Sequence, residues 1–165
     1  MKVFIPSKNR ASQLHLLVES LQIKCPNLKT DIHVLYTADS KEYNYGYDLF
    51  KKRNPDVTME YEACFESDFW HYLTTNQDKY IMLLTDDCVF YRNYAGENWD
   101  IMNLITGNVW CFSFRLGLNT TTQWYRTGQQ QDHLGILGYD SIDNNHIRWN
   151  WKIRQPFENY GYMMS

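Results

Sequence analysis

The chain has 165 residues, 44% of them hydrophobic and 21% charged, which is the composition of a globular protein able to bury a continuous core. A net charge of -3 and a pI near 5.9 argue against nucleic acid or an anionic membrane as the main partner. No stretch approaches membrane-spanning length, and the apolar run at residues 1–6 is too short for a secretory leader. We therefore expect a soluble, cytoplasmic protein.

Cysteines and aromatic residues add two expectations. The cysteines are widely spaced and include no C-x-x-C pair, so we expect reduced, mostly buried thiols at Cys25, Cys64, Cys88 and Cys111. The aromatic fraction of 16% exceeds what a core of this size needs. Some rings are expected to face a ligand such as a sugar or a base, while most pack the protein's own loops.

A strand, a polar loop and a helix are predicted first. Residues 3–5 are apolar, and residues 6–10 form the polar loop. A helix follows, with Ser12 as its predicted N-cap and with apolar residues at helical spacing, namely Leu14, Leu17, Val18 and Leu21. Cys25-Pro26-Asn27 should end this helix.

Two further strand and helix pairs follow. Residues 32–36 predict a strand that stops at Thr37-Ala38-Asp39-Ser40, and residues 43–52 predict a helix. Residues 57–61 alternate in polarity and predict a third strand, and residues 68–75 predict a third helix. Alternating strands and helices indicate a mainly parallel sheet with helices on its faces.

The most informative stretch comes next, where the apolar run of residues 80–84 ends abruptly at Thr85, Asp86 and Asp87. Such a short run is typical of a strand buried on both faces, and open α/β sheets bind ligands beyond the carboxyl ends of their strands. Adjacent carboxylates repel each other, and a divalent cation offsets that repulsion. Our hypothesis is a metal site for a phosphorylated substrate. The alternative is that these residues cap a turn or a helix start.

The alternation breaks after this strand. Residues 93–98 predict a loop, residues 101–105 a short apolar segment, and residues 109–116 a strong strand. From Gly117 onward Gly, Asn, Gln and Thr dominate, and tryptophans occur without periodicity. Long irregular loops in a compact domain are typically functional or disordered, and the tryptophans favour function.

The ends of three predicted strands meet at one edge of the sheet, and their polar side chains match a nucleotide diphosphate. Lys8 and Arg10 can neutralise phosphates, Asp39 can accept hydrogen bonds from a base or ribose, and Asp87 with Asp86 can bind a bridging cation. Each residue also has a structural interpretation, as a solvated loop charge or a turn residue. Neither G-x-x-x-x-G-K-[S/T] nor G-x-G-x-x-G occurs, which excludes a P-loop hydrolase and a hydride-transferring Rossmann enzyme.

These residues resemble a known family. The segments Ile5-Pro6-Ser7-Lys8-Asn9-Arg10, Asp39 and Leu84-Thr85-Asp86-Asp87-Cys88-Val89 look like the donor-binding half of GT-A fold glycosyltransferases, similar to family 2. Residues 112–117 look like the following strand of small viral and bacterial members. The resemblance is strong to about residue 119. It implies an α/β, Rossmann-like fold in one domain of residues 1–165, with a donor-binding part at 1–119 and a loop-rich, acceptor-side part at 120–165.

The same resemblance implies a glycosyltransferase of the hexosyltransferase class. Such an enzyme would use a nucleotide-sugar donor, with a UDP-sugar as the first expectation, and a hydroxyl acceptor such as a glycan. Mn²⁺ or Mg²⁺ would occupy the D-x-D position, where Thr85 replaces the first acid. Asp87 would be the direct ligand, and Asp86 would contact ribose or a metal-bound water. The implied substrate-binding residues are Pro6, Ser7, Lys8, Arg10, Thr37, Asp39, Asp86 and Arg115.

The catalytic base stays open. In an inverting enzyme an acidic side chain takes the proton of the acceptor hydroxyl, and the candidates are Asp132, Asp140, Asp143 and Glu158. His133 and His146 are candidates for a further metal ligand or a base. The ending at residues 160–165 looks like a segment that continues in relatives, so we expect the chain to stop before an element that could carry the base.

Two other classes of protein compete with this interpretation. One is a nucleotide-sugar or carbohydrate-binding module that has lost catalysis, which fits the early ending and the tryptophan-rich second half. The other is a receiver domain of the response-regulator type, in which acidic pairs at strand ends also bind Mg²⁺. Receivers carry that pair after the first strand, whereas Asp86 and Asp87 lie in the middle of the chain.

Overall fold

The computed structural model describes residues 2–28, 30–78 and 81–93, and beyond them only the backbone of six short strands. The chain divides into two compact units, the first comprising Met1–Phe112 with Asn159–Ser165 and the second Ser113–Glu158. The functional division expected at residue 119 stays a prediction.

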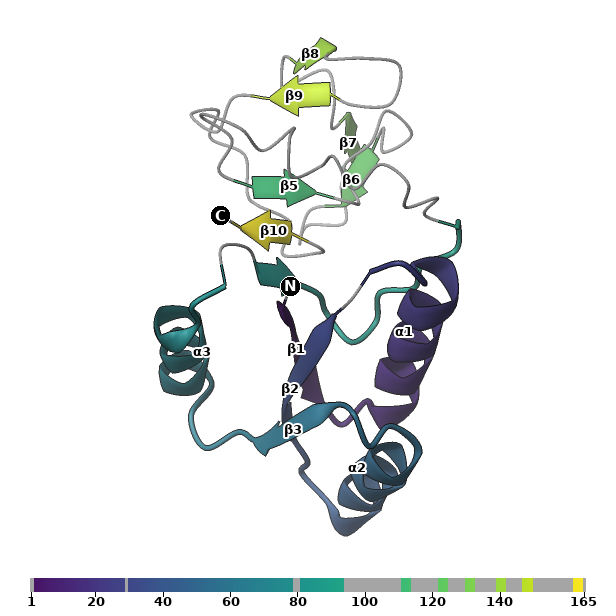
Figure 1. Ribbon diagram of the computed structural model, residues 1–165, viewed down its shortest axis with the longest axis vertical. Coiled ribbons are helices and arrows are strands. Elements are labelled where there is room, and N and C mark those ends of the chain that lie inside the picture. Colours follow the sequence, from purple (N-terminus) through teal and green to yellow (C-terminus); the bar gives the residue numbers. More distant parts are fainter. Residues whose placement is uncertain are drawn as a thin grey trace. The chain divides into compact units, whose positions relative to one another are not determined.

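The first unit confirms the predicted alternation of strands and helices (Figure 1). In chain order its elements are β1 (Lys2–Lys8), α1 (Ala11–Lys24), β2 (Asp31–Thr37), α2 (Lys41–Arg53), β3 (Thr58–Tyr61), α3 (Phe65–Thr75) and β4 (Ile81–Leu83). The sheet has the order β3-β2-β1-β4-β10-β5, where β5 is Cys111–Ser113 and β10 is Tyr162–Met164. Strands β1 to β4 are parallel and β10 is antiparallel to β4. The fold class is therefore α/β with a mainly parallel sheet, as predicted.

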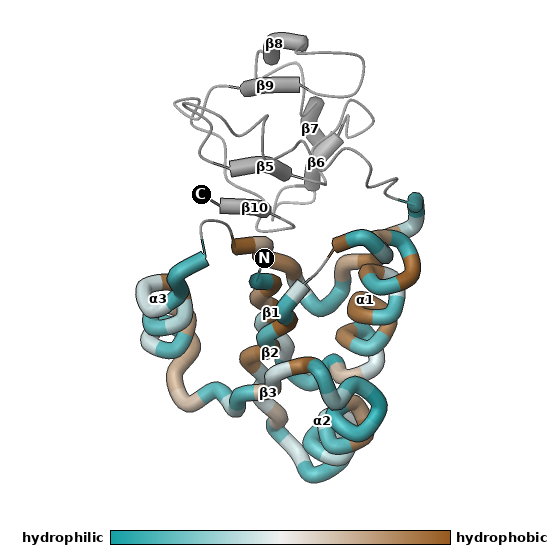
Figure 2. The backbone as a smooth tube through the Cα atoms, in the orientation of Figure 1, coloured by the Kyte–Doolittle hydropathy of each residue, from teal (hydrophilic) through white to brown (hydrophobic). Residues whose placement is uncertain are grey.

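Helices cover both faces of strands β1 to β4. Figure 1 shows α1 and α2 on one side of these strands and α3 on the other. Phe4, Leu35 and Ile81 form a cluster against which Phe69 and Leu73 of α3 pack. Val3 and Ile5 alternate with Phe4 and face the α1 side, where the helix buries its apolar residues Leu14, Leu17, Val18 and Leu21. The hydropathy colouring of Figure 2 shows the same apolar centre within the first unit.

The path of the chain creates a topological switch point between β1 and β4. From β1 the chain moves outward through β2 to β3, and then returns to the other side of β1 as β4. Connections on either side of such a point lie on opposite faces of the sheet, which leaves a crevice beyond the carboxyl ends of the two strands. The segments that follow β1 and β4 are Asn9-Arg10 and the acidic turn.

Pro6 separates the two strands at this point. The carbonyl of Phe4 accepts a hydrogen bond from the Leu84 backbone N–H at 3.0 Å, and the β1–β4 ladder ends at Phe4 and Leu83. Two residues further on, Pro6 faces the same side of β1 but has no N–H to pair. Strand β4 can therefore leave β1 at this point without leaving a buried N–H donor unpaired.

The start of α1 differs from the prediction. The helix begins at Ala11, with Arg10 at the N-cap position, and its N-cap side chain makes no capping hydrogen bond. The predicted N-cap Ser12 is wrong, since it lies inside the helix and donates its hydroxyl to Gln13 Oε1 at 2.9 Å. The physical reason is Asn9, whose left-handed backbone (φ 59°) turns the chain from β1 directly into the helix.

Other predicted elements are present, but they begin or end at different residues. Helix α3 begins at Phe65, before the predicted Asp68, and the Asp68 carboxylate accepts from the backbone N–H groups of Ala63 and Cys64. In the predicted buried strand, Ile81 and Met82 are buried and Leu83 is half-buried. The strand predicted over residues 109–116 is confirmed at Cys111–Ser113. The predictions for residues 94–105 lie outside the described part of the chain.

The exposure of the cysteine side chains corrects one expectation. Of the cysteines whose side chains are described, Cys25 is buried, Cys88 is half-buried and Cys64 is exposed. The prediction that the thiols are mostly buried was therefore wrong.

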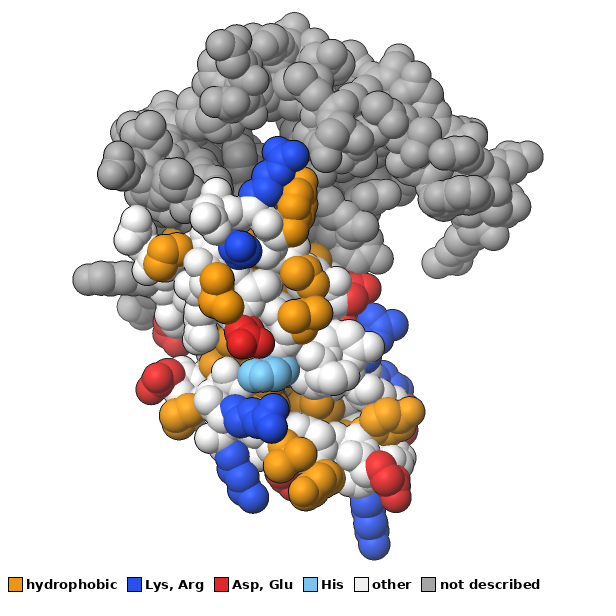
Figure 3. All heavy atoms as spheres, turned by 90° about the vertical axis from the view of Figure 1, so that its right-hand side faces the viewer, with side chains coloured by type: hydrophobic (Ala, Val, Ile, Leu, Met, Phe, Trp, Pro, Cys, Tyr) orange, Lys and Arg blue, Asp and Glu red, His pale blue; other side chains and the backbone are white. Residues whose placement is uncertain are grey.

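Within the described residues, no helix has the length and apolarity that crossing a membrane requires. In the first unit, Figure 3 shows hydrophobic, basic and acidic side chains interspersed on one face.

The second unit contains two antiparallel strand pairs. Strand β6 (Thr122–Trp124) pairs with β7 (Gln130–Asp132), and β8 (Tyr139–Ser141) pairs with β9 (Ile147–Trp149). Two candidates for the catalytic base belong to these ladders, Asp132 opposite Thr122 and Asp140 opposite Arg148.

Candidate functional site

The acid pair forms a tight turn directly after β4. The Cys88 backbone N–H donates to the Thr85 carbonyl at 3.0 Å, which closes a turn with Asp86 and Asp87 at its two central positions. The Thr85 hydroxyl donates to Asp87 Oδ1 at 2.7 Å. The segment therefore forms a turn, as the alternative interpretation expected, but the hydrogen bonds of its described side-chain oxygens are to other side chains and not to backbone N–H groups.

Asp86 points into the protein. It is 5% exposed, its Oδ2 accepts the Ser7 hydroxyl at 2.9 Å, and its Oδ1 lies 3.4 Å from Arg10 Nη1. Burial raises the pKa of the Asp86 carboxyl, while the Ser7 hydrogen bond and the Arg10 charge oppose that rise. Asp87 instead points outward, with 48% of its side chain exposed and its Oδ2 3.5 Å from Arg10 Nη1.

Tyr47 of α2 makes hydrogen bonds to Ser7 and Arg10. Its side chain is fully buried, its hydroxyl lies 2.8 Å from Ser7 Oγ, and it accepts the backbone N–H of Arg10 at 3.1 Å. Burial is the main cause that raises the pKa of Tyr47 above its ordinary value. Helix α2 thus reaches the carboxyl end of β1 through one phenol group, and Ser7 continues the contact to Asp86.

A second set of contacts joins the ends of β1 and β2. Asn9 Nδ2 donates to Asp39 Oδ2 at 2.8 Å, and the Asp39 backbone N–H donates to Asn9 Oδ1 at 2.9 Å. The Asn9 backbone N–H donates to the Thr37 carbonyl at 3.2 Å, and Lys8 Nζ lies 3.2 Å from Asp39 Oδ1. The hydrogen bond from Asn9, followed by Lys8, lowers the pKa of Asp39. Asp39, whose side chain is exposed, is therefore ionised at neutral pH.

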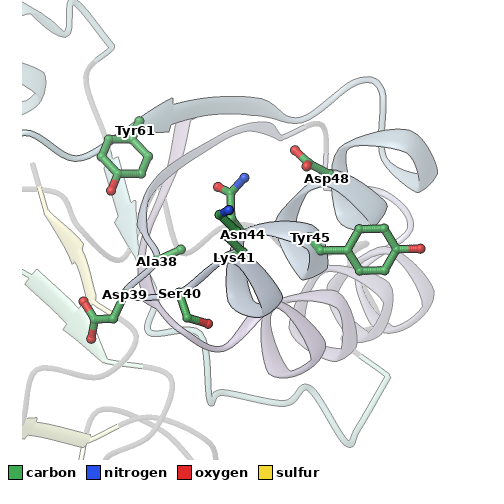
Figure 4. Close-up of a pocket in the computed structure, with 8 residues that line it drawn as sticks. All are labelled: Ala38, Asp39, Ser40, Lys41, Asn44, Tyr45, Asp48 and Tyr61. Atoms are coloured by element: carbon green, nitrogen blue, oxygen red, sulfur yellow. The ribbon is translucent and has the colours of Figure 1, made fainter.

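An open depression of about 600 Å³ adjoins Asp39. Its lining comes from the β2–α2 connection, from α2 and from the end of β3, and comprises Ala38, Asp39, Ser40, Lys41, Asn44, Tyr45, Asp48 and Tyr61. Figure 4 shows Tyr61 and Tyr45 on opposite sides of it, with Lys41 and Asn44 between them. Ser40 caps α2, because its Oγ accepts the Tyr43 backbone N–H at 3.3 Å.

The segment after the acidic turn returns to α1. The Phe90 backbone N–H donates to Ser20 Oγ at 3.0 Å, and the buried Ser20 hydroxyl donates to the Leu17 carbonyl at 2.8 Å. These two hydrogen bonds restrain the segment that follows the acid pair.

The donor set fits a hard divalent cation. Among the described residues no group of three or more His, Cys, Asp or Glu side chains comes together to hold a metal. Ions such as Mg²⁺ are commonly held by one or two carboxylates, while water and substrate phosphates complete the coordination. Asp87 is suited to that role because its carboxylate is half exposed, although Thr85 and Arg10 contact its oxygens, whereas Asp86 is buried.

The structure brings together most of the predicted site residues. Those that lie around the carboxyl ends of β1, β2 and β4 are Pro6, Ser7, Lys8, Arg10, Thr37, Asp39, Asp86 and Asp87. Their roles toward a ligand stay predictions. The predicted Arg115, Asp143 and Glu158, with His133 and His146, lie outside the described residues. Of Asp132 and Asp140 only the backbone is described.

Sequence reasoning missed two residues of the site. Asn9 was within the predicted loop, and an Asn between a strand and a helix is a signal for left-handed backbone. Tyr47 had no such signal, because the sequence around it is rich in tyrosines and nothing local marks the one that turns inward.

Comparison with known proteins gives distant matches among solved structures. No protein-family model matches the sequence, and no curated protein matches it. The mannosyltransferase PcManGT from Pyrobaculum calidifontis, solved with GDP-Man and Mn²⁺, is similar over 68% of this chain and 34% of its own, with 13% identity and a TM-score of 0.48. The galactosyltransferase LgtC, solved with donor and acceptor sugar analogs, is similar over 67% of this chain and 45% of its own, with 13% identity and a TM-score of 0.44.

A structure of an active-site mutant of LgtC matches 79% of this chain and 56% of its own, with 12% identity and a TM-score of 0.45. The chain thus spans between about a third and just over half of the length of these proteins. Identities and TM-scores this low assign neither a family nor an activity to this chain.

Proposed function

We propose that this protein is a GT-A type glycosyltransferase that transfers a sugar from a nucleotide-diphosphate donor to an acceptor hydroxyl with the help of Mn²⁺ or Mg²⁺. The observation that carries this proposal is the convergence of Arg10, Asp86 and Asp87 at the switch point between β1 and β4. Ligands of open α/β sheets bind at such points. The sequence resemblance described above supports the same activity.

Each side chain then has a part in donor binding. Asp87, the exposed carboxylate, would hold the cation, and Arg10 would present its planar guanidinium to the diphosphate. Asp39, ionised beside the open depression, would accept hydrogen bonds from the base or ribose. Asp86 and Ser7 would keep Arg10 and the acidic turn in place, since both are buried and bonded to each other.

The chemistry is displacement at the anomeric carbon of the donor sugar. When bound, the cation supplies Lewis-acid stabilisation of the charge that builds on the departing diphosphate. Arg10 stabilises the same charge through hydrogen bonds that strengthen as the bond to the sugar breaks. The base that accepts the proton of the acceptor hydroxyl would come from Asp132, Asp140, Asp143 or Glu158, which all follow the donor-binding part in sequence.

The topology disfavours the receiver-domain alternative. Receiver-like folds have the strand order 2-1-3-4-5, whereas this sheet has the order β3-β2-β1-β4 before its antiparallel neighbour β10. The acid pair also follows the fourth strand in the chain.

Calorimetric titration of the full chain with UDP, GDP and dTDP, each with Mn²⁺ and again with EDTA, tests the proposal. We expect one nucleotide to bind with Mn²⁺ and to lose that binding in EDTA. The matching nucleotide-sugars should then release nucleoside diphosphate on incubation with the protein. Metal-dependent binding without release of nucleoside diphosphate would identify the catalytically incomplete binding module instead, and no binding of any nucleotide would refute the donor site.

A further inference from the structure

The Arg10 guanidinium contacts both members of the acid pair. One atom, Nη1, lies 3.4 Å from Asp86 Oδ1 and 3.5 Å from Asp87 Oδ2. The side chains of Arg10 and Asp87 are each about half exposed, whereas that of Asp86 is 7% exposed. Among the ion pairs of the described residues, Arg10 is the cation that neutralises these two carboxylates.

The two oxygens of Asp87 differ in how firmly they are held. Oδ1 accepts the Thr85 hydroxyl at 2.7 Å, a short bond within the turn itself. Oδ2 has the longer contact with Arg10, at 3.5 Å. A divalent cation that binds Asp87 therefore meets the Oδ2 side, where the guanidinium lies. Two positive charges at one carboxylate oxygen repel each other, so each weakens the binding of the other there.

Resting on the function proposed above, we propose that Arg10 competes with the divalent cation for Asp87 and that the donor's diphosphate ends this competition by accepting Arg10. A guanidinium matches phosphate oxygens with two parallel hydrogen bonds, which is better geometry than its long contact with Asp87. The cation alone binds weakly, because it must displace Arg10 without offering the guanidinium a new partner. Cation and diphosphate consequently bind with positive cooperativity.

The surroundings of Arg10 allow this exchange by rotation of its side chain alone. Its backbone N–H is held by Tyr47, and its carbonyl accepts the Leu14 N–H at 2.9 Å in the first turn of α1. Asp86 keeps its Ser7 hydrogen bond at 2.9 Å when the guanidinium leaves. The main chain of the site therefore stays fixed while the half-exposed guanidinium moves from the acid pair to the ligand.

Mn²⁺ titration without nucleotide tests the competition directly. We compare the whole chain with Arg10→Gln and with the control Lys2→Gln, which removes the same charge from the opposite end of β1, where Lys2 pairs with Asp31. Arg10→Gln should bind Mn²⁺ about tenfold more tightly, a coupling of ordinary size for two linked sites. Lys2→Gln should keep the wild-type Mn²⁺ affinity, and Asp87→Asn should lose Mn²⁺ binding.

Titration with inorganic diphosphate in saturating Mn²⁺ tests the second half. Arg10→Gln should bind diphosphate about tenfold more weakly, so the same substitution changes the two affinities in opposite directions. Arg10→Lys should keep the low Mn²⁺ affinity because the charge remains, and should weaken diphosphate binding because an ammonium group lacks the planar fork.

The competition is refuted if Arg10→Gln binds Mn²⁺ no more tightly than the wild type, and also if neither protein binds it. These readouts use metal and diphosphate only, so a failure of the proposed sugar transfer shows itself separately in the nucleotide-sugar experiment. Should Arg10→Gln not fold, NMR of the arginine Nε–H signals in the wild type during a Mg²⁺ titration replaces it. A shift of the Arg10 signal supports displacement, and an unchanged signal at Mg²⁺ saturation contradicts it.

Discussion

Ser7 donates its hydroxyl proton to Asp86 Oδ2 at 2.9 Å, which joins the ends of two parallel strands across 79 residues of sequence. An ionised carboxylate only accepts, so the proton on Ser7 is directed toward Asp86. The Tyr47 hydroxyl, 2.8 Å away, must then donate to Ser7 Oγ while it accepts the Arg10 N–H at 3.1 Å. Every hydroxyl proton in this buried network has one assigned direction, and the network fixes the acid pair relative to Arg10.

Ser7→Ala should reduce the free energy of unfolding by about 1–3 kcal/mol, because it leaves the buried Asp86 oxygen and the Tyr47 proton without partners. Ser12→Ala is the matched control, since Ser12 bonds only to the side chain of its neighbour Gln13 on the surface. Urea unfolding of both variants measures the difference. Equal stability of the two would mean that the Ser7 hydroxyl contributes nothing.

Tyr47→Phe should be coupled to Ser7→Ala. Each substitution breaks the same hydrogen bond, so the double variant should lose less stability than the two single losses added together, by about 0.5–3 kcal/mol. A double-mutant cycle by urea unfolding measures this. The same cycle with Ser12→Ala in place of Ser7→Ala should be additive, and additivity in both cycles would contradict the network.

Asp87→Ala should abolish metal-dependent nucleotide binding and leave the unfolding free energy close to the wild-type value. The exposed ion pair with Arg10 contributes little to stability, and removal of one of two adjacent carboxylates relieves their repulsion. Asp56→Ala, an exposed acid in the turn before β3, makes the same charge change away from the site. Calorimetry with nucleotide and Mn²⁺ decides the matter, and unchanged affinity in Asp87→Ala would refute the metal assignment.

Tyr72 should make the protein sensitive to alkaline pH. Burial, followed by the charges of Asp31 and Asp78, raises the pKa of Tyr72 to about 12 from its ordinary value of 10.0. The pKa of Tyr72 is higher in the folded protein than in the unfolded one, so the protonated phenol favours the folded state. Its contribution to the free energy of unfolding is complete below pH 10 and is lost as pH rises toward 12. The loss should reach about 1 kcal/mol by pH 11.

In Tyr72→Phe the free energy of unfolding should fall less between pH 9 and pH 11 than it does in the wild type. Urea unfolding of both proteins at these two pH values measures the difference. The variant should also be at least as stable as the wild type near neutral pH, because the buried Tyr72 hydroxyl has no hydrogen-bond partner among the described residues. An identical drop in stability for the two proteins would show that Tyr72 ionises in the folded state as easily as in the unfolded one.

The elements around the site were predictable because they depend on local patterns. The apolar residues of α1 recur at helical spacing, and the run before Thr85 is short and bounded by polar residues, so both elements were found. The limits of elements were less secure. Ser12 was expected to cap α1, yet the left-handed Asn9 starts the helix earlier, and that conformation depends on its bonds to Asp39.

By itself the sequence determined the order of strands and helices, the placement of an acid pair after a buried strand, and the basic loop after β1, since each follows from neighbouring residues. Only the tertiary structure decided that Asp86 is buried and Asp87 exposed, although the two are chemically identical neighbours. It also decided that Tyr47 bonds to Ser7 and Arg10 and that β10 pairs with β4. The physical reason is that these features depend on contacts between residues far apart in sequence, which are set by how the strands and helices pack together.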